Sequence, residues 1–185
     1  MGRRQAPFEA AAWAIRRADD ALAAVVQRFV DAKASSGVPL PAILRDAVFH
    51  SMASVCLGAA VSAFDGNYAA TVMLSMLIAC IGPREVALWK QHALRAGQMW
   101  TPAVAQACFS EAERRRRYFL PFRIAFLLLN AWNCYASAAY PVTVTDVACM
   151  VMVAVFTARL YLERARPAEL QPEIPAVTVR TAEPA

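Results

Sequence analysis

Lysine and arginine are missing from two long stretches of this sequence, Asp46 to Pro83 and Ile124 to Ala158. The same stretches are its most apolar. Each is long enough for two membrane-crossing helices and a short turn, because a bilayer core of roughly 30 Å takes about 20 helical residues. With 59% hydrophobic residues, the chain is also more apolar than an ordinary soluble domain. We therefore expect an all-α integral membrane protein with four transmembrane helices arranged as two hairpins.

Sequence motifs that mark enzymes are missing as well. The chain has no HExxH, GxxxxGK[ST], GxSxG, GxGxxG or paired CxxC motif. Its five cysteines are widely spaced, which is typical of small packing residues. The two histidines, His50 in the first span and His92 in the central loop, cannot hold a haem between two spans. His50 is interpreted as a hydrogen-bonding residue, with a proton relay as the alternative. We expect no catalytic residue, no bound metal and no cofactor.

The net charge of +5 lacks the pattern of a nucleic-acid-binding surface. The basic residues flank apolar segments, and in the four-span arrangement all of them fall on one side. The positive-inside rule then places both termini and the central loop on the inner face of a bacterial or mitochondrial inner membrane. One basic run, Arg114, Arg115, Arg116 and Arg117, precedes the third span. It is interpreted as a topology anchor and as a site for anionic lipid, for example cardiolipin.

Helix breakers and charge divide the chain into five parts. A Ser, Gly and Pro segment ends the first helix, and Asp65-Gly66-Asn67 supplies a tight turn. The expected parts are an amphipathic amino-terminal helix with its linker (1–45), the first hairpin (46–83), a helical loop on the basic side (84–117), the second hairpin (118–162) and a Pro-rich tail (163–185).

The amino-terminal helix carries an apolar repeat. Large residues recur every seven positions, with smaller ones between them, which predicts a helical stripe. The members of the stripe are Phe8, Ile15, Leu22 and Phe29. The helix could lie in the membrane interface or bind a helix of another subunit, and the small residues beside the stripe favour a partner.

Two further patterns predict helix packing. Ser54, Gly58 and Ser62 recur every four residues on the first span, and small residues at this spacing allow two helix backbones to approach closely. Asn130 and Asn133 lie within the third span, where buried amides form hydrogen bonds between helices or line a polar path.

Two arginines, Arg123 and Arg159, fall inside the third and fourth spans. Their long side chains are expected to reach the basic interface.

These features favour a non-catalytic accessory or assembly subunit of a larger membrane complex, in an energy-transducing membrane. Its expected partners are other membrane subunits and anionic lipids. Two alternatives remain. Two hydrophobic hairpins flanked by amphipathic helices resemble the general layout of reticulon-type membrane-shaping proteins. A small transporter or channel could be built around the amides of the third span, although that span region lacks a mid-membrane charge.

Overall fold

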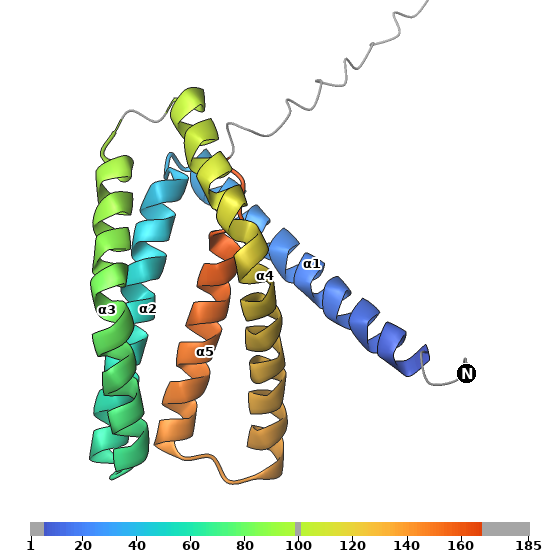
Figure 1. Ribbon diagram of the computed structural model, residues 1–185, viewed down its shortest axis with the longest axis vertical. Helices are drawn as coiled ribbons and strands as arrows, with labels where there is room; N and C mark the ends of the chain where they lie inside the picture. Colours follow the sequence, from blue (N-terminus) through green and yellow to red (C-terminus); the bar gives the residue numbers. More distant parts are fainter. Residues whose placement is uncertain (1–5, 99–100, 168–185) are drawn as a thin grey trace, which may run out of the picture.

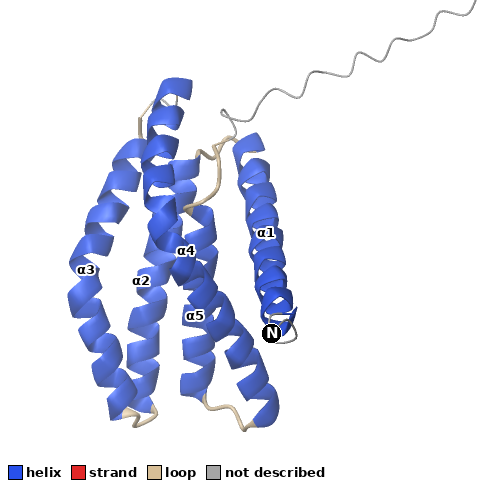
Figure 2. Cartoon of the chain, turned by 45° about the vertical axis from the view of Figure 1, so that its right-hand side comes forward, coloured by secondary structure: helices blue, strands red, loops and turns tan. Residues whose placement is uncertain are grey.

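The computed structural model describes residues 6–98 and 101–167, without the side chains of 6–8, 102, 107–108 and 111–120. Five α-helices make up these ranges, as Figures 1 and 2 show, and no strand occurs in them. The all-α prediction is confirmed. The helices are α1 (Ala6–Ser35), α2 (Leu40–Phe64), α3 (Tyr68–Ala96), α4 (Pro102–Ala139) and α5 (Val144–Leu162).

Within the described residues three helices, not the predicted four, are long and apolar enough to cross a membrane. They are α2, α3 and α5. The segment predicted as the third span, which belongs to α4, is not among them. Its apolar run is interrupted by Arg123, Asn130 and Asn133, and a guanidinium and two amides lower the mean hydropathy of the segment.

The helix ends follow local backbone chemistry. Gly37 follows the end of α1, and Gly66 lies in the turn between α2 and α3. Their φ values are 78° and 71°, in the region that glycine adopts without strain. Asn67 caps α3 by accepting a hydrogen bond from the Ala70 amide. Thr143 and Asp146 form a reciprocal capping box at the start of α5. α3 continues through Pro83, so the helix runs unbroken from Tyr68 to Ala96.

α2 to α5 form an open layer in the order α3, α2, α5, α4 (Figure 1). Within the described residues, α3 packs only on α2, and the contact between α3 and α4 that would close a bundle is not formed. Both helix turns, at 65–67 and 140–143, lie at one end of the layer, which we call the turn end. At this end Thr145 donates a hydrogen bond of 2.7 Å to Asp65, joining the two turns.

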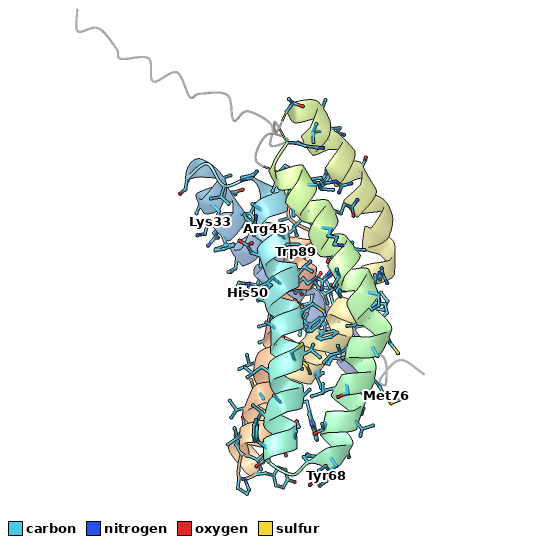
Figure 3. All side chains as sticks on the ribbon, turned by 90° about the vertical axis from the view of Figure 1, so that its left-hand side faces the viewer. Lys33, Arg45, His50, Tyr68, Met76 and Trp89 are labelled. Atoms are coloured by element: carbon cyan, nitrogen blue, oxygen red, sulfur yellow. The ribbon has the colours of Figure 1, made fainter. Side chains whose placement is uncertain are left out.

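α1 lies against the opposite end of the layer, which we call the tethered end. It runs obliquely to the other helices (Figure 1) and contacts α5, α4 and α2. Val30 of α1 is 1% exposed and packs with Ile43 and Ala165 in a small apolar cluster. Lys33 lies at the same end, whereas Tyr68 lies at the turn end and the side chain of Met76 points away from the layer (Figure 3).

One of the small residues of α2, Gly58, lies at the interface with α3. Gly58 and Ser62 are buried and Ser54 is half-buried, and Ser51 and Val55 of the same helix are also buried. A Cβ atom built on Gly58 would lie 3.4 Å from Cδ1 of Leu74, at the limit of ordinary contact.

We expect Gly58→Leu to separate α2 from α3, because the extra volume cannot be absorbed without moving a helix, and to lower stability by about 1 to 3 kcal/mol. Gly58→Ala should cost much less, since its single Cβ fits at van der Waals distance. Ala60→Leu, at an exposed position of the same helix, is the volume-matched control. Thermal unfolding of the three purified variants measures the difference. Equal stability of Gly58→Leu and Ala60→Leu would show that this face is not a close contact.

Candidate functional site: a buried charge network

The tethered end contains a cluster of charged side chains centred on Asp19 of α1. The carboxylate accepts hydrogen bonds of 3.1 Å from both Nε and Nη2 of Arg123 on α4. It also accepts a hydrogen bond of 2.7 Å from the Tyr161 hydroxyl and one of 3.0 Å from Arg164. We call these four residues the Asp19 cluster. One carboxylate thereby joins α1 to α4, to the end of α5 and to the segment that follows it.

Three of the four members of the Asp19 cluster are buried, and the Arg164 side chain is 20% exposed. Asp19, Arg123 and Tyr161 are 8%, 3% and 2% exposed. The guanidinium carbon of Arg123 also lies 5.7 Å from the centre of the Tyr161 ring, within the range of a cation–π contact. Asp20, the next residue of α1, stays largely exposed and reaches Arg164 only at 3.9 Å. Of these two neighbouring carboxylates on α1, only that of Asp19 is buried against the other helices.

The pKa of Asp19 is set by two opposing effects. Burial raises it, but hydrogen bonds from Arg123 and Tyr161 and the positive charges of Arg123 and Arg164 outweigh burial, so the pKa lies below 3.8. Because the folded pKa is depressed, the carboxylate contributes its stabilisation fully above the unfolded value. That contribution is lost only as the pH falls through the lower, folded pKa. The Asp19 carboxylate is thus ionised near neutral pH.

A second cluster lies beside the first and joins α3 to α5. Arg159 pairs with Glu85 of α3 and, at 3.1 Å, with Glu163 four residues further along. The Arg159 and Glu85 side chains are 7% and 10% exposed. Glu85 Oε2 accepts no hydrogen bond within the described part of the chain, so its pairing with Arg159 is held by charge. We call Arg159, Glu85 and Glu163 the Arg159 cluster.

The two clusters together form a charge network that is neutral overall. It contains three guanidinium groups and three carboxylates. Arg123, Arg159 and Glu85 lie about 22 to 26 Å along their helices from the turn end, at 1.5 Å per residue. Four members of the two clusters belong to the last turn of α5 and the residues after it: Arg159, Tyr161, Glu163 and Arg164. This helix end is therefore the centre of the network.

The structure differs from the sequence expectation for both arginines. Arg123 and Arg159 were expected to extend to the basic interface, but each is buried against carboxylates of other helices. Neither Asp19 nor Glu85 was singled out as a partner. One local signal was available: Arg159 and Glu163 are spaced for an i, i+4 ion pair on one helix. The partners on α1 and α3 come from distant parts of the chain, and no local pattern identifies them.

The polar residues of α4 are placed differently from one another. Asn130 donates hydrogen bonds of 2.7 Å to the Phe126 carbonyl and to the Thr157 hydroxyl on α5. Thr157 in turn donates to the Val153 carbonyl. Asn133 is half-buried and forms no hydrogen bond within the described residues. One amide therefore links α4 to α5, and the other has no hydrogen-bond partner among the described residues.

The remaining sequence-predicted residues lie apart from the network. His50 is exposed, and its Nδ1 donates to the Asp46 carbonyl of its own helix at 2.6 Å (Figure 3). Ile15 of the α1 stripe is half-buried, while Leu22 and Phe29 are 37% and 48% exposed. The side chains of Phe8 and of the four arginines 114–117 lie outside the described residues.

We expect Asp19→Ala to release α1 from the layer. The change leaves Arg123 buried without its carboxylate, and removing one partner of a buried pair costs about 3 to 5 kcal/mol. The matched control is Asp20→Ala, which removes an exposed carboxylate from the same turn. Limited proteolysis of the purified variants reports the release as faster cleavage within α1. The same cleavage rate in both variants would contradict the role of Asp19.

Metal-ligating side chains do not gather into a group of three or more within residues 6–98 and 101–167. The cations of the network are guanidinium groups, which supply only donors, so its chemistry is that of interhelical ion pairing. Comparison with models of protein families, with curated proteins and with solved structures gives no match to this chain.

Proposed function

We propose that the chain is a non-catalytic membrane subunit that joins a larger assembly through α4. The observation that carries this proposal is the side chain of Asn133, which forms no hydrogen bond in the described residues although it lies on a helix at the edge of the layer. In a bilayer, Asn133 would lie about 10 Å from the turn end, within the hydrocarbon region. A polar side chain at that depth is usually hydrogen-bonded across a helix interface.

The surroundings of Asn133 support a protein contact. The neighbouring aromatic side chains Trp132 and Tyr135 are 60% and 64% exposed, and their ring centres lie 5.8 Å apart. Aromatic residues are enriched in protein interfaces, where they supply large contact area with a polar atom. The opposite edge of the layer differs, because α3 exposes Val72, Met73 and Met76, which suit contact with acyl chains. Both edges expose apolar side chains, and the feature that supports a protein contact at α4 is the aromatic pair beside Asn133.

The membrane arrangement belongs to the same proposal. α2, α3 and α5 would cross the bilayer, and α4 would cross beside α5, with which it forms a hairpin whose turn lies at the turn end. Arg123 is compatible with this placement because its charge is compensated by Asp19. The tethered end would face the positive-inside side of a bacterial or mitochondrial inner membrane, together with the arginines 114–117.

The charge network favours an architectural role over transport. Its carboxylates are each paired with arginine, which keeps its proton in proteins. At about 22 to 26 Å from the turn end, the network would lie near one face of a roughly 30 Å hydrocarbon core and not at its middle. An ion or proton path usually places ionisable groups within the span, facing a water-filled cavity. Pairing of this kind holds helices together and leaves α4 in a defined position for assembly.

Site-specific photo-crosslinking in native membranes tests the proposal. A photoreactive amino acid replaces Asn133 in one variant and Met73, on the opposite edge, in the control. We expect a discrete protein adduct from position 133 and none from position 73, because only α4 would contact another subunit. The adduct should carry the same partner that co-purifies with the unmodified chain in a mild detergent. A chain that purifies alone and gives no adduct from position 133 would contradict the proposal.

A further inference from the structure

The residues that follow α5, 163–167, lie against α1, and we call them the strap. Ala165, in the middle of the strap, is 7% exposed and packs in one apolar cluster with Val30 of α1 and Ile43 of α2. Pro167, at the end of the strap, is fully buried. The first residues of the predicted Pro-rich tail therefore belong to the packed part of the structure.

The side chain of Gln27 on α1 binds the backbone of the strap through both polar groups of one residue. Its Oε1 accepts a hydrogen bond of 2.9 Å from the Arg166 amide, and its Nε2 donates one of 3.1 Å to the Arg166 carbonyl. Nε2 also donates to Asp31, one turn further along α1, at 2.8 Å, which orients the Gln27 side chain. Paired residues of two antiparallel strands exchange hydrogen bonds in the same way. Gln27 therefore recognises the backbone at position 166 and not its side chain.

Two arginine side chains extend the contacts of the strap. Arg164 donates a hydrogen bond of 3.0 Å to Asp19 of α1. The guanidinium carbon of Arg166 lies 5.5 Å from the centre of the Phe109 ring on α4, within the range of a cation–π contact. The strap thereby connects α1 to α4 as well as to α2.

The strap supplies much of what holds α1 to the layer. Within residues 9–35, Asp19 and Val30 are the only buried side chains of α1, and the strap contacts both of them. Residues 36–39 join α1 to α2 and hold only one end of the helix. A connection at one end constrains the direction of a helix less than contacts further along it. The direction of α1 is therefore set at Asp19, Gln27 and Val30.

We propose that the strap fixes the direction of α1, so that the segment after the last helix governs the position of the first one. The Arg166 backbone is 139 residues away from Gln27 in the sequence. α1 is made first, but it becomes fixed last, because its docking site is complete only when residues 163–167 are present. Drawing the strap away from Gln27 would release the carboxyl-terminal half of α1. This inference rests neither on the membrane arrangement nor on Asn133, and each can fail alone.

Hydrogen–deuterium exchange of the full-length chain in a mild detergent tests the inference. Arg166→Pro removes the amide that binds Gln27, whereas Arg166→Ala removes the same guanidinium and keeps both backbone groups. We expect the amides of residues 20–34 to exchange about tenfold faster in Arg166→Pro than in Arg166→Ala, because a helix with fewer attachments opens more often. Equal exchange in the two variants would overturn the inference, since the strap backbone would then not hold α1.

A second pair of variants removes the same hydrogen bonds from the side of α1. Gln27→Met keeps the length of the side chain but neither polar group, and Arg28→Met, at the adjacent exposed position, is the control with a similar helix propensity. Exchange within residues 20–34 should rise in Gln27→Met and not in Arg28→Met, while α2 and α3 stay protected in both. Unchanged protection of residues 20–34 in Gln27→Met would overturn the inference, even if Arg166→Pro unfolds the whole chain.

Discussion

A guanidinium or carboxylate group that leaves water must be compensated, and the tethered end of this protein contains six such groups. They are matched in number and sign, and four helices or helix ends contribute them. Breaking one buried pair leaves an uncompensated charge, which is far more costly than losing an exposed ion pair. The positions of α1, α3 and α4 relative to α5 are therefore constrained together. A displacement of any one helix would leave a charge without its partner.

The open layer makes this constraint important. A closed helix bundle would fix its members by packing on several sides, whereas within the described residues α3 packs only on α2, and α4 packs only on α5 and α1. The turns are joined at one end by Thr145 and Asp65, and the charge network joins the helices at the other end. α5 takes part in both connections. Away from α1, the layer is uncovered within the described residues, which suits the contacts with lipid and with another subunit proposed above.

Much of the architecture was predictable from the sequence because it depends on local patterns. The apolar runs, Pro and Gly positions and capping residues predicted an all-helical chain with turns near Asp65 and Thr143, and the helices end there. The number of apolar spans was wrong by one. Arg123 and two asparagines make the second half of α4 too polar to count as an apolar span. The prediction was based on the length of the segment without lysine or arginine, which does not register the two amides.

The charge network was not predictable, for a physical reason. Asp19 looks like one of several acidic residues on an amphipathic helix, and its partner Arg123 is 104 residues away. Only the packing of α1 on α4 and α5 distinguishes it from Asp20. In contrast, the amide of Asn130 attracted attention from sequence because a polar residue in an apolar run is conspicuous. Its bond to Thr157 still required the fold.

The coupling between Glu85 and Arg159 tests the role of the charge network most directly. α3 and α5 have no close backbone contact in the described residues, so energetic coupling between these side chains reports the ion pair itself. The measurement is the free energy of unfolding of Glu85→Gln, Arg159→Gln and the double variant. The account predicts that the double variant loses less stability than the two single losses added together, by about 0.5 to 3 kcal/mol. Additive losses would show that the pair does not hold α3 to α5 and would contradict it.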